Sequence, residues 1–498
     1  MYTKIKSAIL NGFEGRLIDI ESAMTAGLPS FIIIGLPDAI VKESTERIRA
    51  ALKYYKITLP PRRIIINLSP AGIRKSGAHL DLGIVMTLLK LLNVVKFQLE
   101  GDYSFLGELT LEGKILPLNG VLVLLETLKK AGVKKVILPA GNYEEGSYVE
   151  GIELVPVTAL DDVIRYINDG RVPESPLRQY EEDKLASESG VNYSEIKGQE
   201  SAKRAVAIAL SGCHNLLLIG PPGTGKTMLL KNTPSLLPVL SFEESMEVAK
   251  VYGASGRDGL YYIKKKRPPF RAPHHSIGRA ALVGGGSRPQ PGEIALANKG
   301  VLFLDELSEF KGEFLELLRE PLENKEMVIS RLGHRVVYPT DFILLAAMNP
   351  CKCGYYGSEM KTCTCTPSTV RRSLSKLSKP LLDRIDMIVW VNDVEIEVLR
   401  SNPNNRSLTT EELKEMIRDG RQRIESVTAS KDEIEFEAES ERVMQHGYNT
   451  LELSPRTYQK VIAISRTIAM MDDCVTVKSH HVLEALQYRK VEKLFRGV

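Results

Sequence analysis

Short apolar runs alternate with helical patterns over the first third of the chain. Apolar side chains at 160, 163, 164 and 167 form one stripe, which ends at Gly170 and predicts a helix at the end of this region. A further helical pattern covers 38–53. The predicted strands lie at 31–34, 64–66 and 136–138. Residues 1–168 therefore predict a first domain of the α/β or α+β class.

The composition changes after this domain. Residues 169–192 contain six acidic residues, two prolines and few apolar positions, which predicts an exposed linker. Strand, loop and helix patterns then alternate over 193–395, as in an α/β domain with a parallel sheet. Residues 396–498 are mostly helical, and their clearest helix begins with Ser454 as N-cap and Pro455 at the first position. Three domains also agree with the length of 498 residues.

The overall charge excludes a histone-like polycation. The chain has 66 Lys and Arg residues against 62 Asp and Glu, which gives a net charge of +4. No apolar run approaches the roughly 18 residues of a membrane helix, and the N-terminus lacks a signal-peptide pattern. We therefore expect a cytoplasmic protein that has no membrane partner.

A phosphate-binding loop follows the apolar run 216–219. The glycines of the motif G-x-x-x-x-G-K-[ST] let backbone amides close around phosphates. Lys226 is expected to reach the β- and γ-phosphates, and the Thr227 hydroxyl to bind Mg²⁺. A glycine-rich turn that binds no ligand is the alternative, but it would not explain the lysine and the hydroxyl at these two positions. The motif consists of Gly220, Pro221, Pro222, Gly223, Thr224, Gly225, Lys226 and Thr227.

Two further apolar runs end in polar residues. The run 301–304 is followed by Asp305, which would bind magnesium, and Glu306, which would polarise the attacking water. The run 342–348 ends at Asn349, whose amide could contact water and the γ-phosphate. The alternative interpretation is that these two acidic residues form a solvent-exposed turn without a catalytic role. Because ligands bind at the carboxyl ends of parallel strands, we expect all three residues beside the phosphate loop.

This order of motifs resembles the AAA+ ATPases, which use ATP and Mg²⁺. On that resemblance, Asn349 corresponds to sensor 1. Arg384, in the segment 381–386, corresponds to the arginine finger that enters a neighbouring subunit's site, and Arg456 corresponds to sensor 2. Without the resemblance, a surface ion pair explains either arginine equally well. A finger that acts on a neighbour implies a ring.

A strongly basic segment interrupts the ATPase domain. Residues 259–292 carry seven Lys or Arg and no Asp or Glu, and Tyr261, Tyr262 and Phe270 lie among them. This combination suits phosphate contact and stacking on bases, although a solvated loop has the same composition. Loops inserted here in ring motors usually face the central pore. The candidate DNA contacts are Lys264, Lys265, Lys266, Arg267, Arg271 and Arg279.

A second basic element precedes the 342–348 run. Two β-rich runs predict a hairpin over 327–338, as in the pre-sensor 1 insertion group of AAA+ proteins. Its tip adds Arg331, His334 and Arg335 to the candidate DNA contacts.

Four motifs together resemble the magnesium-chelatase-like AAA+ proteins, and most closely the ComM/YifB branch. They lie at 271–276, 292–297, 348–351 and 381–386, and the resemblance covers essentially the whole chain. It implies a homo-hexameric ring motor that acts on single-stranded or branched DNA and promotes branch migration in recombination and natural transformation. A protein-remodelling motor and a chelatase-type motor subunit remain alternatives.

The segments 70–77 and 107–117 are similar to the Lon protease domain, an α+β fold of the S5 type. Lon uses a Ser–Lys dyad, but this chain has His79 at the serine position and Leu122 at the lysine position. Ser76 lies three places early and has no matching base. We therefore expect no peptidase activity.

Four of the six cysteines form a C-x-C, C-x-C pattern. Cys351, Cys353, Cys363 and Cys365 could converge on Zn²⁺ in tetrahedral geometry. Free thiols and a redox sensor are the alternatives. Four cysteine ligands leave no open position, so the zinc ion would be structural.

Overall fold

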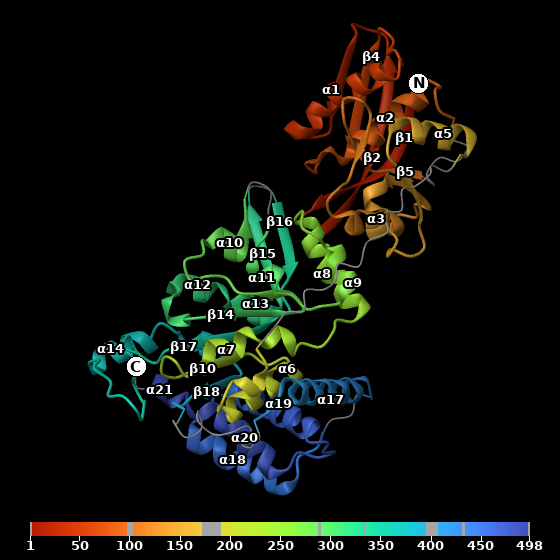
Figure 1. Cartoon of the computed structure of the whole chain (residues 1–498). Helices are drawn as coiled ribbons and strands as arrows, with labels where there is room; N and C mark the ends of the chain where they lie inside the picture. The colour runs from red at the N-terminus through yellow and green to blue at the C-terminus, as the bar shows by residue number, and fades with distance from the viewer. Residues whose placement is uncertain are drawn as a thin grey trace.

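The computed structural model describes residues 2–96, 103–171, 191–286, 290–331, 334–394, 407–430 and 434–496. Figure 1 shows three parts in succession: the N-terminal part at one end, an α/β part in the middle and a helical part at the other end. The segments 172–190 and 395–406 lie outside the described residues. The predicted linker 169–192 and the domain limits at 168, 193 and 395 therefore stay predictions.

The N-terminal part contains a four-stranded sheet of order β1-β2-β4-β3, in which only β3 and β4 run parallel. Its strands are β1 (Tyr2–Asn11), β2 (Glu14–Thr25), β3 (Ser30–Ile34) and β4 (Arg63–Ser69). Helix α1 (Ala39–Tyr54) begins at Asp38, whose carboxylate accepts from the Val41 amide. Helix α2 (Asp81–Leu91) is apolar on nearly every side and is therefore buried.

Smaller elements complete this part. A three-stranded parallel sheet consists of β5 (Tyr103–Phe105), β8 (Lys135–Pro139) and β9 (Glu153–Val157), and a short hairpin of β6 (Glu108–Leu109) and β7 (Ile115–Leu116). The helices are α3 (Val121–Lys130), α4 (Tyr143–Gly146) and α5 (Leu160–Asp169). Helix α5 ends at Gly170 in the left-handed conformation, as the apolar stripe predicts.

The middle part contains a parallel five-stranded sheet of order β11-β14-β17-β10-β18. Its strands are β10 (Leu216–Ile219), β11 (Phe270–Arg271), β14 (Val301–Leu304), β17 (Ile343–Met348) and β18 (Met387–Trp390). Every residue of β10, β14 and β17 is buried, as expected for strands that helices cover on both faces. The α/β class with a parallel sheet is confirmed.

Short helices and hairpins surround this sheet. The helices are α6 (Glu200–Ser211), α7 (Lys226–Lys231), α8 (Phe242–Ala254), α9 (Leu260–Lys265), α10 (Arg279–Val283), α11 (Glu293–Leu296), α12 (Gly312–Leu317), α13 (Arg319–Asn324), α14 (Pro367–Leu374) and α15 (Lys379–Leu382). The predicted hairpin is present as β15 (Glu326–Arg331) and β16 (His334–Pro339), and β12 (Gly284–Gly285) pairs with β13 (Gln290–Pro291).

The basic segment 259–292 is not one exposed loop, because it supplies strand β11 at the edge of the sheet. Phe270 on this strand stacks on Phe303 at a centroid distance of 6.0 Å, and Tyr262 packs on Tyr252 at 4.3 Å. Both rings thus have an internal partner, and their stacking on bases stays a prediction. Tyr261 is 38% exposed.

The C-terminal part is helical. It consists of α17 (Thr410–Ser430), α18 (Ala438–Leu451), α19 (Pro455–Met471), α20 (Ser479–Lys490) and α21 (Lys493–Arg496). The Ser454 hydroxyl accepts from the Thr457 amide at 3.1 Å, so the predicted start of α19 is confirmed. Among the described helices, none is long and apolar enough to cross a membrane.

The N-terminal part packs on α8, α9 and the β15–β16 hairpin, and Figure 1 shows α3 beside α8. Phe13, in the β1–β2 turn, contacts the apolar clusters of the hairpin and of α8. A Cβ atom on Gly12 would lie 2.0 Å from Val336 Cγ1, so the approach is close. Ion pairs Lys250–Glu126 and Lys264–Glu144 add to this interface.

Candidate active site

The carboxyl ends of β10, β14 and β17 surround a cavity of about 380 Å³. The phosphate loop forms one wall, with Pro222, Gly223, Gly225, Lys226 and Thr227, and Met228 lies beside it. Asp305, Glu306 and Asn349 also line the cavity. The structure thus brings together residues that are 123 positions apart in the sequence, from Lys226 to Asn349. Their shared edge of the sheet is the one that the motifs predict.

Lys226 is held by the phosphate loop itself. Its Nζ donates to the carbonyls of Gly220 and Pro221 at 2.8 and 2.6 Å, and the Thr224 hydroxyl also donates to the Pro221 carbonyl, at 2.9 Å. Burial lowers the pKa of Lys226 to about 8. A triphosphate in the cavity would favour the charged ammonium and offset this burial. Among the described residues that line the cavity, Lys226 is the only Lys or Arg.

Thr227 and Asp305 lie where a magnesium ion would be held. The Thr227 hydroxyl donates to Asp305 Oδ1 at 3.0 Å. Hydroxyl and carboxylate oxygens are ligands that Mg²⁺ prefers, and the ion usually completes its shell with waters and phosphate oxygens. These two residues therefore fit the ion.

Glu306 adopts an uncommon backbone conformation. Its φ of 49° lies in the left-handed region, and its amide donates to Asp305 Oδ1 at 3.0 Å. Such strain occurs most often at functional sites. The side chain is 58% exposed, with Oε2 at 3.8 Å from His275 Nδ1. Sequence reasoning missed His275, because the 271–276 motif served only as a family signature.

The two candidate arginines do not line the cavity, although they lie close to each other. Arg384 Nη2 and Arg456 Nη2 both pair with the carboxylate of Glu323. Arg384 also donates to the Arg319 carbonyl at 2.9 Å and the Pro380 carbonyl at 2.7 Å. Sequence reasoning missed Glu323, which lies in no recognisable motif.

The four cysteines converge as the spacing predicts. Sγ of Cys351, Cys353 and Cys363 lie 3.4 to 3.7 Å apart, and all four Sγ atoms lie within 4.8 Å of one another. A tetrahedral centre with Zn–S bonds of about 2.3 Å places its sulfurs about 3.8 Å apart. Backbone amides of Tyr355 and Thr364 lower the pKa of Cys353 to about 5, which favours the thiolate. The cluster therefore fits a zinc ion.

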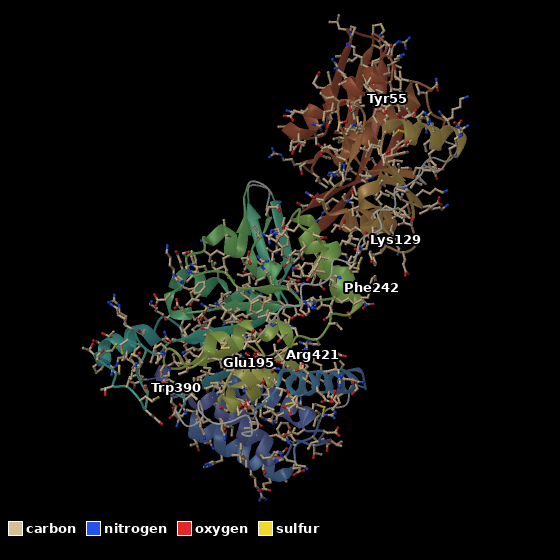
Figure 2. The ribbon with its side chains drawn as sticks, in the orientation of Figure 1. Tyr55, Lys129, Glu195, Phe242, Trp390 and Arg421 are labelled. Carbon is tan, nitrogen blue, oxygen red and sulfur yellow. The ribbon has the colours of Figure 1, made fainter. Side chains whose placement is uncertain are left out.

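The cysteine loop lies against the phosphate loop. A Cβ atom on Gly354 would lie 2.6 Å from Pro222 Cδ, and one on Gly357 would lie 2.8 Å from Trp390 Cζ2. Trp390, at the end of β18, is labelled in Figure 2. The cysteine loop thus supports the wall of the nucleotide cavity.

The candidate DNA contacts differ in their surroundings. Lys266, Arg279 and Arg335 are exposed, whereas Lys265 and Arg267 are half-buried. Arg271 forms a bidentate ion pair with Glu293 at 2.6 and 2.7 Å. Lys264 pairs with Glu144 of the N-terminal part. The side chains of Arg331 and His334 lie outside the described residues.

A second cavity, of about 570 Å³, lies between the N-terminal and middle parts at the Lon-like segment. Ser76 and His79 line it, and Nε2 of His79 lies 3.1 Å from the Ala8 carbonyl. Leu122, at the position of the Lon lysine, is fully buried in an apolar cluster.

Family models match most of the chain. Residues 192–399 match "Magnesium chelatase, subunit ChlI", residues 20–142 match "Subunit ChlI of Mg-chelatase", and residues 409–489 match "Magnesium chelatase, subunit ChlI C-terminal". The Lon protease of Lachnoclostridium phytofermentans is 28% identical over 164 residues, which are 30% of this chain and 20% of that protein.

Several curated relatives match nearly the whole chain. The competence protein ComM of Haemophilus influenzae is 36% identical over 504 residues, which cover 97% of each chain. YifB of Escherichia coli is 35% identical over 492 residues, 97% of this chain and 96% of that protein. This chain therefore belongs to the magnesium-chelatase-like AAA+ ATPases, in the ComM/YifB group.

Proposed function

We propose that this chain is an ATP-driven motor that acts on DNA as a homo-hexameric ring and promotes branch migration. The observation that carries this proposal concerns positive charge at the nucleotide cavity. Among the described residues that line the cavity, Lys226 is the only Lys or Arg, whereas Arg384 and Arg456 do not line it and pair with Glu323. A γ-phosphate there needs further positive charge during hydrolysis. A neighbouring copy that supplies both arginines would complete the site and require a ring.

Each side chain of the site has a role in this proposal. Lys226 binds the β- and γ-phosphates, while Thr227 and Asp305 hold the magnesium ion that neutralises phosphate charge. Glu306 polarises the attacking water, and Asn349 orients it. The phosphate loop excludes other water from the reacting groups. The four cysteines hold a structural zinc ion that keeps the adjacent loop on Pro222.

Two observations support DNA as the substrate. Lys266, Arg279 and Arg335 are exposed cations on segments that flank the ATPase sheet. The full-length relative from Haemophilus influenzae carries the name competence protein. Contact with phosphates fits the exposed cations, whereas protein-remodelling pores usually rely on aromatic and hydrophobic loops. Because Tyr262 and Phe270 already pack on internal rings, we expect Tyr261 to be the residue of the basic segment that stacks on bases.

The chelatase alternative has less support. The magnesium-chelatase 38 kDa subunit of Cereibacter sphaeroides is 27% identical over 177 residues, only 32% of this chain. The family model that matches residues 20–142 also carries the chelatase name, so the N-terminal part alone does not distinguish a ComM-type motor from a chelatase subunit. The coverage of nearly the whole chain by ComM and YifB supports the proposal over the chelatase alternative.

The rate of ATP hydrolysis tests the proposed substrate. The purified chain is assayed with single-stranded, duplex and four-way-junction DNA at equal nucleotide concentration, and with an unfolded protein. Stimulation by junction DNA is expected. Stimulation by the unfolded protein alone would contradict the proposal and favour a protein-remodelling motor.

A further inference from the structure

Glu323 joins two arginines that come from distant parts of the sequence. It lies on α13, 61 residues from Arg384 and 133 residues from Arg456. One carboxylate oxygen accepts from each guanidinium group. Both positive groups thus converge on one anion.

The two arginines also share a scaffold. Asp386, two residues after Arg384, pairs with Lys460 at 2.7 Å, and Lys460 lies one helical turn after Arg456 on α19. Asp386 also accepts from the backbone amide of Asn215 at 2.7 Å, and Asn215 Nδ2 donates to the Arg384 carbonyl at 3.1 Å. Since Asn215 directly precedes β10, the arginines are anchored to the strand that carries the phosphate loop.

The Glu323 carboxylate is accessible from outside the chain. The side chains of Glu323 and Arg456 are 40% and 46% exposed, whereas that of Arg384 is 12% exposed. The ion pair between Glu323 and Arg456 is weak, because water already solvates both partners. A terminal phosphate carries more negative charge than a carboxylate, and guanidinium groups bind its oxygens in bidentate geometry. A phosphate that reaches this surface can therefore replace Glu323.

We propose that Glu323 is the resident counter-ion of Arg384 and Arg456, which occupies both until the terminal phosphate of ATP on a second copy of this chain displaces it. This inference rests on the proposed role of the two arginines at a neighbour's site. The Glu323 carboxylate therefore raises the concentration of chain needed for assembly, because its two ion pairs must break before each new interface can form. ADP lacks the terminal phosphate and does not displace Glu323.

The concentration midpoint of ATP-dependent self-association tests this role. Chains with Glu306→Gln, which are expected to retain ATP, serve as the reference and are compared with chains that also carry Glu323→Gln. Light scattering or sedimentation gives the midpoint in ATP and in ADP. The matched control is Glu320→Gln, an exposed glutamate on the same helix. Thermal unfolding of each variant checks that it is folded.

Removal of the carboxylate is expected to lower the midpoint in ATP about two- to fivefold, the effect of weak surface ion pairs. No shift is expected in ADP or with Glu320→Gln. In chains that keep Glu306, the KM for ATP is expected to fall while kcat is retained. Glu323→Asp, with a shorter side chain, is a second variant that should lower the midpoint less.

An unchanged or higher midpoint for the folded Glu323→Gln chain in ATP would overturn the counter-ion role. A higher midpoint would mean that Glu323 positions the arginines instead. If the reference chain fails to self-associate in ATP at any concentration, the ring itself is contradicted, and the role of Glu323 fails with it.

Discussion

The hydroxyl of Thr227 donates a 3.0 Å hydrogen bond to Oδ1 of Asp305, 78 residues further along the chain. This bond joins the phosphate loop to the end of β14, so the two proposed magnesium ligands lie side by side in the cavity. The next residue, Glu306, turns through a left-handed backbone conformation. In the proposed mechanism, this arrangement separates metal binding, at Thr227 and Asp305, from the activation of water at Glu306.

Glu306→Gln is therefore expected to retain ATP binding while kcat falls about 100-fold or more, the usual contribution of a general base. Equilibrium binding of a fluorescent ATP analogue and steady-state hydrolysis measure the two effects. Glu309→Gln, an exposed change three residues later, is the control and should leave both unchanged. Normal turnover in Glu306→Gln would remove this residue from the proposed role.

Loss of one cysteine ligand is expected to affect both metal content and nucleotide affinity. Cys363→Ser should lower bound zinc from about one ion per chain to a small fraction, as measured by metal analysis. Because Gly354 packs on Pro222, the KM for ATP should also rise, by about tenfold or less. Cys213→Ser, at an exposed cysteine outside the cluster, should change neither. Metal-free wild-type protein with full ATPase activity would contradict the zinc site.

The salt dependence of DNA binding should separate exposed cations from paired ones. Lys266→Ser and Arg279→Ser are each expected to reduce the log–log slope for duplex DNA by about 0.9. Arg271→Ser should instead lower the melting temperature, since it leaves Glu293 without its bidentate partner. Lys493→Ser, on α21, is the control for a general loss of charge. If the double variant of Lys266 and Arg279 keeps the wild-type slope, the basic segment does not bind phosphates.

The interface between the N-terminal and middle parts should weaken as the pH rises from about 4.5 to about 7. Burial raises the pKa of Glu145 from 4.5 to about 7, with a smaller contribution from Asp258. A Cβ atom on Gly253 of α8 would lie 3.3 Å from its Oε1, so the carboxyl group faces the middle part. Since the folded state favours the protonated form, the protonated Glu145 carboxyl group contributes its full stabilisation of the fold below about pH 4.5. This contribution is lost as the pH rises through 7.

Glu145→Gln should remove this dependence. The melting temperature of the variant, relative to wild type, is expected to rise between pH 5 and pH 8, with a free-energy difference of at most about 3 kcal/mol. The exposed Glu150→Gln is the matched control. A difference that stays constant across this range, or that falls towards pH 8, would contradict the raised pKa.

Local motifs made the nucleotide cavity predictable from the sequence. The phosphate loop and the run before Asp305 each specify a buried strand together with the chemistry at its end, so the fold and the site follow from the same residues. The convergence of the four cysteines was equally predictable, because two C-x-C pairs on one short loop are a spacing typical of metal sites.

Contacts between distant residues were not predictable. Glu323 has no local signature, and its partners lie 61 and 133 positions away. Lys264 belongs to a run of cations, yet its partner Glu144 lies in the N-terminal part. Phe270 lies on a strand of two residues, which is too short for periodicity to indicate its buried side. Tertiary packing decides each of these outcomes.

The conversion of a labelled four-way DNA junction into two duplexes tests the central claim most directly. In the presence of the purified chain, conversion should require ATP hydrolysis. The wild type is expected to convert the junction in ATP, and Glu306→Gln to bind it without conversion. If the wild type binds the junction and hydrolyses ATP, yet leaves the junction as intact in ATP as in ADP, the chain is not a branch-migration motor.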